Sequence, residues 1–96
     1  MNYLLEFTAA AKADLLESYD WYQQKLSGLG DDFLDAVEEQ IYFILNNATS
    51  VAIFVDDYRK VNTKRFPFKI IFSVNKSTII IEAVYHHNRD IKKWKR

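Results

Sequence analysis

The apolar positions in the first half of the chain repeat with the period of an α-helix. Thr8 follows a short apolar segment, residues 3–7, and its hydroxyl can cap the first turn of a helix. Spacings of four, three and four then place one apolar set on a single helical face: Leu15, Tyr19, Tyr22 and Leu26. After the break at residues 27–30, which holds both glycines, the same period recurs at Phe33, Val37, Ile41 and Ile44. So short a connection predicts an antiparallel helix hairpin.

The second half of the chain changes to the pattern of β-strands. Residues 58–61 form a short strand candidate, while residues 68–74 and 78–85 are rich in β-branched and aromatic side chains. A turn is expected between the two long runs, at residues 75–77. Three consecutive isoleucines, residues 79–81, favour a strand that is covered on both faces.

Together these elements predict an α+β fold. We expect an N-terminal strand, then an antiparallel helix hairpin packed on a mainly antiparallel sheet of three to four strands. Residues 90–96 are expected to make one short helical turn from which Trp94 packs back. A chain of 96 residues has room for one modest core, so the prediction is a single domain over residues 1–96.

Composition removes several classes of protein. The sequence contains no cysteine, which excludes disulfide scaffolds, thiolate zinc sites and cysteine nucleophiles. No run approaches the roughly 18 apolar residues that a membrane helix needs, and the first residues lack the basic start of a signal peptide. We therefore expect a cytoplasmic protein that does not bind a membrane.

The formal net charge of zero conceals a strong asymmetry. Residues 1–57 carry eleven acids and two bases, a net charge of −9, whereas residues 58–96 carry eleven bases and two acids, a net charge of +9. One interpretation is a basic surface that faces phosphates. The other is an ordinary domain whose acidic and basic elements attract one another.

Five basic residues cluster along the sequence where the strands begin: Arg59, Lys60, Lys64, Arg65 and Lys69. Alternation along strands places some of them on one face, where guanidinium groups bind phosphate with two parallel hydrogen bonds. Aromatic residues lie among them, as in proteins that bind single-stranded nucleic acid. The alternative is that the charges are solvated and most of the rings form the core, with Tyr58 and Tyr85 the better candidates for exposure.

The segment His86-His87-Asn88-Arg89-Asp90 directly follows the last predicted strand. A histidine beside an arginine can protonate a leaving group while the arginine neutralises phosphate charge. Adjacent histidines on an extended chain point to opposite sides, and with no cysteine and only Asp90 and Glu82 as nearby acids we expect no metal site. We expect no cofactor either. The alternative is a cap at the strand end, with His86 or His87 hydrogen-bonded to the backbone.

The order of several segments is typical of one superfamily. They are Tyr3–Phe7, Ala10–Leu16, Tyr19–Tyr22, Tyr58–Val61, Arg65–Phe72 and Val84–Asp90, with Trp94 after them. The most specific are the strand Arg65-Phe66-Pro67-Phe68-Lys69-Ile70-Ile71-Phe72 and the ending H-x-x-R-D-x-x-x-W. The chain thereby resembles RelE/ParE-type toxins. This resemblance implies the toxin of a type II toxin–antitoxin pair, a class also called plasmid stabilisation proteins.

The resemblance implies two alternative targets. RelE-like members cut mRNA on the ribosome without a metal, which suggests Arg65, Lys69, His87 and Arg89 as catalytic residues and Arg59, Lys60 and Lys64 as phosphate-binding residues. That set is incomplete, because Lys95 stands where RelE has a tyrosine and no glutamate base lies near Ser50. ParE-like members instead inhibit DNA gyrase by binding it and catalyse no reaction themselves. A degenerate toxin that only binds antitoxin is a third possibility.

The resemblance implies a cognate antitoxin as partner. The assembly expected is a toxin–antitoxin hetero-oligomer or a homodimer of the toxin. Toxins of this kind accept the C-terminal helix and strand of the antitoxin along the hairpin and sheet. The expected contact residues are aromatic: Tyr19, Trp21, Tyr22 and Tyr42. Alternatively, at least half of these rings pack onto the sheet.

Overall fold

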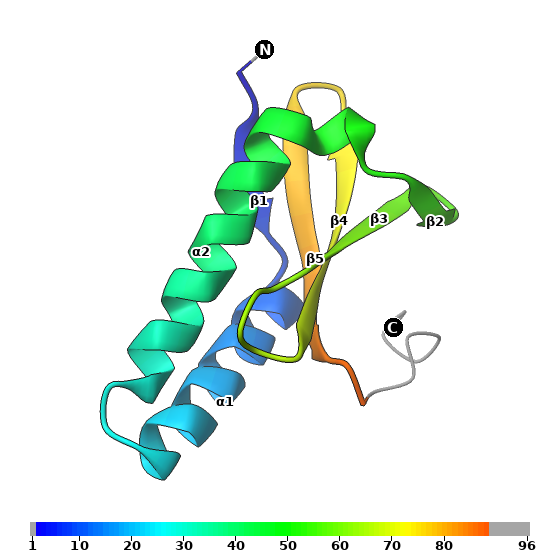
Figure 1. Ribbon diagram of the computed structural model, residues 1–96. Helices are drawn as coiled ribbons and strands as arrows, with labels where there is room; N and C mark the ends of the chain where they lie inside the picture. The colour runs from blue at the N-terminus through cyan, green and yellow to red at the C-terminus, as the bar shows by residue number, and fades with distance from the viewer. Residues whose placement is uncertain (1, 89–96) are drawn as a thin grey trace.

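The computed structural model describes residues 2–88, which form a helix hairpin packed on one face of a five-stranded sheet (Figure 1). In chain order the elements are β1 (Leu4–Phe7), α1 (Ala9–Lys25), α2 (Leu29–Asn47), the 3-10 turn η1 (Ala48–Ser50), β2 (Ile53–Val55), β3 (Tyr58–Asn62), β4 (Phe68–Asn75) and β5 (Thr78–His86). The predicted α+β fold with an N-terminal strand and a helix hairpin is confirmed. The expected turn at residues 90–96 lies outside the described residues.

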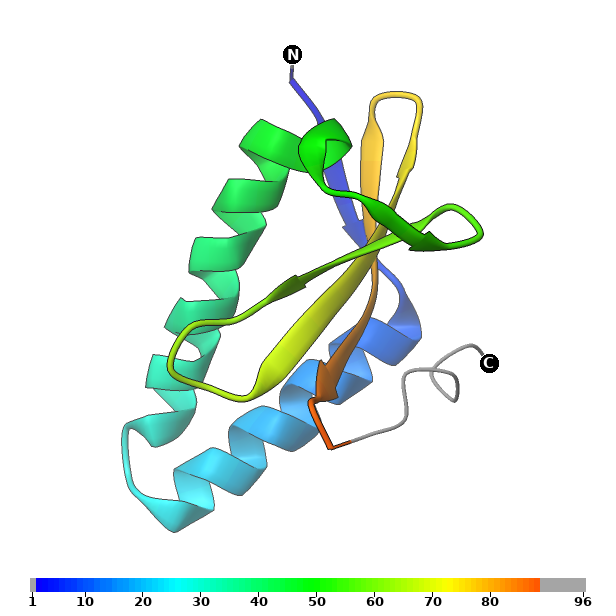
Figure 2. The same ribbon diagram turned by 45° about the vertical axis from the view of Figure 1, so that its right-hand side comes forward.

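The strands are arranged in the order β1-β5-β4-β3-β2, so that the first and last strands of the chain are neighbours. β1 runs parallel to β5, and every other neighbouring pair is antiparallel. Figure 2 shows both helices on the same side of this sheet. The sheet has more strands than predicted because β2, with only three residues, is too short to show an alternating pattern.

Helix α1 begins where the sequence predicts it. The hydroxyl of Thr8 accepts a hydrogen bond from the Ala11 N–H (3.0 Å) and donates one to the Glu82 carbonyl oxygen in β5 (3.1 Å). The predicted buried face is partly wrong, because the buried residues of α1 are Ala11 and Asp14, and Leu26 is 63% exposed just beyond the helix. Ala11 is fully buried in the core, and Leu15 and Tyr22 of the predicted face are partly buried against it.

Helix α2 follows the predicted pattern closely. Phe33, Val37 and Ile44 are buried and Ile41 is partly buried against the same core. The hairpin connection depends on its two glycines. Gly28 has a φ of +91°, which favours a residue without a Cβ, and a Cβ at Gly30 would lie 2.8 Å from the backbone oxygen of Tyr19.

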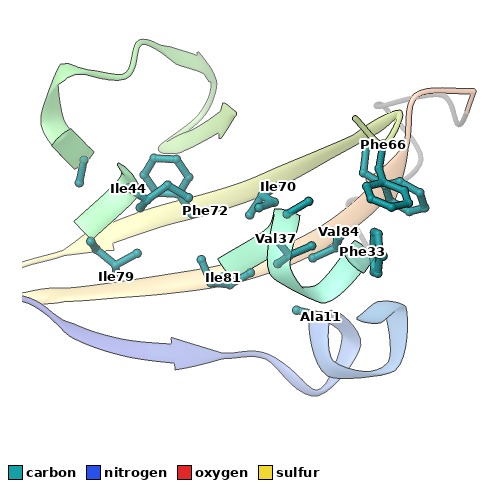
Figure 3. Close-up of a cluster of buried hydrophobic side chains, with 13 residues drawn as sticks. Ala11, Phe33, Val37, Ile44, Phe66, Ile70, Phe72, Ile79, Ile81 and Val84 are labelled. Carbon is teal, nitrogen blue, oxygen red and sulfur yellow. The ribbon is translucent and has the colours of Figure 1, made fainter. Parts of the chain in front are cut away.

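The core lies between the helix hairpin and the facing side of β4 and β5 (Figure 3). Alternation along the strands directs Ile70 and Phe72 of β4, and Ile79 and Ile81 of β5, into this core. Phe66 and Phe68 are also buried here. Their burial agrees with the alternative in which the aromatic rings form the core and do not bind nucleic acid.

The side of the sheet that faces away from the helices, which we call the outer face, holds a second and smaller apolar cluster. Ile71, Ala83 and Tyr85 are buried there beneath Phe54 and Tyr58. The expected exposure of Tyr85 is therefore wrong, because Tyr85 is 3% exposed within this second cluster. Coverage of residues 79–81 on both faces is also incomplete, since Ile80 on the outer face is only partly buried.

Candidate functional site

The basic residues that adjoin each other in sequence are distributed over three places. Lys64 and Arg65 lie in the β3–β4 loop, which Thr63 fastens by donating from its hydroxyl to the carbonyl oxygens of Phe66 (2.7 Å) and Phe68 (3.2 Å). This loop carries its two cations toward α2. Lys64 Nζ lies 3.1 Å from Glu39 Oε1, and Arg65 Nη2 lies 3.8 Å from Asp32 Oδ2. These two ion pairs agree with the interpretation in which the acidic and basic halves of the chain attract one another, and not with a phosphate-binding surface at this loop.

Arg59 is engaged with the backbone at the end of the helix hairpin. Its Nη1 donates to the carbonyl oxygens of Val51 (2.6 Å) and Thr49 (3.3 Å), in and just after η1. Its Nε is buried and has no hydrogen-bond partner in the described structure. The guanidinium thus ties β3 to the segment after α2 through its Nη1.

Lys60 and Lys69 are the two members of the cluster that share a face. Lys60 pairs with Ile71 and Lys69 pairs with Asn62, so the two lysines are diagonal neighbours on adjacent strands of the outer face. The Lys60 ammonium lies 5.1 Å from the centre of the Phe54 ring, and Lys69 stands opposite Tyr85 on β5. They form a small basic patch on an apolar support.

The two histidines point in different directions, as expected. His87 Nε2 lies 3.1 Å from the Phe68 carbonyl oxygen, to which it must donate, and the His87 N–H donates to the Pro67 oxygen (2.7 Å). The His86 ring instead packs edge-on against Phe68, with centroids 5.2 Å apart. These contacts are those of a strand-end cap. Arg89 lies outside the described residues, so its position relative to His87 is not part of this geometry.

The four aromatic residues expected to contact an antitoxin fall into two groups. Trp21 and Tyr42 are 56% and 60% exposed. Tyr22 packs against Phe33 and Phe66, with centroids 5.4 and 5.0 Å away, and this burial raises the pKa of its phenol. Tyr19 lies beside α2, where chiefly the negative charge of Asp31 raises the pKa of its phenol. At least Tyr22 therefore packs onto the core, and Trp21 and Tyr42 offer open ring surface.

A hollow of about 240 Å³ lies between α1 and the end of the sheet. We call it the α1 hollow; its described lining residues are Asp14, Glu17, Ser18, Trp21, Tyr22, Phe68, Val84 and His86. This hollow was not predicted from the sequence. The signal was present, because residues 14, 17, 18 and 21 have the spacing of one helical stripe, but only the packing of β4 and β5 against that stripe creates a cavity.

Residues 2–88 contain no group of three or more potential metal-ligating side chains close together. No helix among them is long and apolar enough to cross a membrane. The class that emerges is a small α+β protein in which the described basic side chains are dispersed, while aromatic rings and a hollow lie open on the surface.

Comparison with known proteins defines the class further. Residues 5–91 match the family described as "ParE toxin of type II toxin-antitoxin system, parDE", so the chain belongs to the ParE toxin family. A similar solved structure is described as "Chromosomal ParDE TA system from P. aeruginosa". It is 25% identical, with a TM-score of 0.78, and the match covers 88% of this chain and 95% of that chain. None of the curated proteins matches. The resemblance to RelE/ParE toxins is confirmed, and the family context supports a cognate antitoxin as partner.

Proposed function

We propose that this chain is a growth-arresting toxin that acts by binding DNA gyrase, as the ParE-like branch of its superfamily does, and that it does not cut RNA. Membership of the ParE family supports this target. The observation that carries the proposal is the dispersal of the basic groups among the described residues. Arg59 is bound to backbone carbonyls, Lys64 and Arg65 face α2, and only Lys60 and Lys69 share an open face.

Cleavage by in-line attack of a 2′-hydroxyl needs a cation on the phosphate and a proton donor near the leaving oxygen at the same time. His87 is the donor that the sequence suggests, and its Nε2 proton is committed to the Phe68 carbonyl oxygen. The commitment of this proton to the backbone supports a toxin that inhibits its target by occupying it.

Ribosome-dependent mRNA cleavage is the second candidate, and one observation favours it. Lys60 and Lys69 are diagonal neighbours on the outer face and form the kind of two-cation patch that binds a phosphodiester. In this alternative both lysines hold the phosphate, and Lys69 stabilises the charge that develops on it.

One pair of assays separates the two candidates. The purified chain is added to gyrase acting on relaxed plasmid and, separately, to ribosomes translating a defined mRNA. We expect supercoiling to stop while the mRNA stays intact, and we expect induction in a bacterial host to block replication and raise the SOS response. Addition of the antitoxin is the control and should restore supercoiling.

Normal supercoiling together with cut mRNA would contradict the proposal. If Lys69→Ala then abolished the cut while circular dichroism showed an unchanged fold, the RNase alternative would replace it. If neither supercoiling nor mRNA changed, antitoxin binding would be the remaining activity.

A further inference from the structure

The two edges of the sheet differ in how far they are protected against pairing with a further strand. β1 and β2 are the edge strands, and they lie on opposite sides of the sheet (Figure 1). β2 has only three residues, its register against β3 shifts between Ile53 and Val55, and the acidic residues 56–57 follow it directly. A very short strand, an irregular register and neighbouring charges are the features with which natural sheets protect an edge.

β1 is short as well, but it lacks the other protecting features. It pairs with β5 over its four residues without a shift in register, and it contains neither lysine nor proline. Leu4 is 69% exposed and Leu5 is 38% exposed, and because they are adjacent in a strand their side chains lie on opposite faces of the sheet. This edge therefore exposes leucine on both faces, where a further strand would cover it.

The backbone of β1 directs hydrogen-bonding groups to the free edge at alternate residues. The N–H groups of Leu4 and Thr8 donate to carbonyl oxygens on the β5 side, over 2.8 and 3.0 Å. Successive residues of a strand direct their N–H and C=O groups to opposite sides. Those of Leu5 and Phe7 therefore point away from β5, at the end of the sheet where β1 is the last strand.

We propose that the free edge of β1 binds β1 of a second copy of this chain, in an antiparallel register centred on Leu5. The contact joins two five-stranded sheets into one continuous sheet. In this register the outward backbone groups of the two Leu5 residues bond to each other, and those of Tyr3 bond to those of Phe7 of the second copy. The inference does not depend on whether the target is gyrase or mRNA.

The side chains of β1 complement one another in this register. On the outer face, Leu4 lies opposite Glu6 of the second copy, so the two carboxylates of the dimer are kept apart. On the helix-facing side the two Leu5 side chains meet, and they are flanked by Tyr3 and Phe7, which pack against the core of each copy. A register centred on Glu6 would instead place two like charges face to face. A surface that complements itself in this way is what a two-fold interface requires.

The contact is small, because it involves only residues 3–7 of each copy and its exposed apolar area comes chiefly from Leu4 and Leu5. An interface of this size belongs to the weak and transient class. We therefore expect a monomer at low micromolar concentration and a dimer toward the millimolar range. The dimer presents every other surface of the chain twice, so a partner with two sites could bind both copies.

The first test is sedimentation velocity of the purified full chain over this range of concentration. Leu4→Glu sets like charges opposite each other twice in a two-fold dimer, so we expect it to raise the dimer Kd about tenfold. Leu16→Glu makes the same change at a leucine of similar exposure (65%) on α1 and should change the Kd by less than about twofold. Because both leucines are exposed, circular dichroism should show an unchanged fold for each variant.

A charge exchange tests the register itself. Adding Glu6→Lys to Leu4→Glu sets opposite charges across from each other, and we expect the double variant to recover most of the lost affinity. A general effect of added charge would not be reversed in this way. A chain that stays monomeric at every concentration, equal effects of Leu4→Glu and Leu16→Glu, or a double variant that fails to recover would each overturn the proposal.

The antitoxin is the other candidate for this edge and gives a distinct result. If the chain alone stays monomeric while Leu4→Glu raises the Kd for the antitoxin more than Leu16→Glu does, the antitoxin occupies the edge and the proposal is overturned. Because none of these measurements involves gyrase or ribosomes, their outcome is separate from that of the proposed function.

Discussion

The two faces of the sheet are built from alternate residues of the same strands and have very different surroundings. On the helix-facing side, Phe33 meets Phe66 and Phe68 with ring centroids 5.6 and 4.8 Å apart, and the hairpin covers the whole cluster. On the outer face, the described residues that pack on the smaller cluster are Phe54 and Tyr58 of the β2–β3 hairpin. The remainder of that face carries lysines and a hydrogen bond from the Ser73 hydroxyl to Glu82 Oε2 (2.8 Å).

The closely packed helix-facing cluster therefore stabilises the fold, whereas the more open surfaces are available to bind a partner. Close packing of large rings makes the helix-facing side intolerant of change, whereas the exposed positions of the outer face tolerate substitution with little loss of stability. Of the surfaces open to partners, the lysine pair lies on the outer face, and the α1 hollow lies at the end of the sheet on its helix-facing side. We therefore expect substitutions to divide sharply according to the face on which they fall.

The largest expected effect is at Phe33. Phe33→Ala removes a fully buried ring and leaves a cavity, so we expect the free energy of unfolding to fall by about 3–5 kcal/mol. Phe54→Ala on the outer face removes a partly buried ring and should cost about 1 kcal/mol. Urea unfolding followed by circular dichroism measures both. Similar losses for the two variants would show that the outer cluster contributes as much as the core.

An intermediate effect is expected where two neighbouring cations differ in their surroundings. Arg59→Met removes the hydrogen bonds to Val51 and Thr49 and should lower the free energy of unfolding by about 1.5–3 kcal/mol. Lys60→Met, one residue later on the outer face, should change it by less than about 0.5 kcal/mol. Thermal unfolding of both variants tests this pair. A loss at Lys60 equal to that at Arg59 would contradict the division between faces.

The smallest effect is expected at the ion pair between Lys64 and Glu39. Their side chains are 74% and 58% exposed, so solvent screens the attraction across 3.1 Å. A double-mutant cycle with Lys64→Ala and Glu39→Ala should give a coupling of less than about 0.5 kcal/mol at low salt, and none in 1 M NaCl. A coupling that survives high salt would indicate that this loop is fixed to α2 more firmly than its exposure suggests.

The hydrophobic pattern was sufficient to predict the helices and the long strands. Phe33, Val37 and Ile44 recur at helical spacing and are buried. The runs at residues 68–74 and 78–85 are rich in β-branched and aromatic side chains, and they form β4 and β5. Strand β2 was not predicted, because three residues are too few to show an alternating pattern. The buried side of α1 was misjudged at Leu26, because nothing in the sequence shows how closely Ala11 approaches β5.

The candidate sites depended far more on tertiary structure. Closeness in sequence suggested one basic cluster from residue 59 to residue 69, but strand alternation and the β3–β4 loop send Arg59, Lys60 and Arg65 to three different environments. The α1 hollow required residues about seventy positions apart, since Asp14 meets Val84 only when β5 lies beside α1. By itself, the sequence determined the periodic elements, the charge of each half and the superfamily. The packing of those elements decided which charged side chains stand together, because contacts between distant residues depend on how the faces of the elements meet.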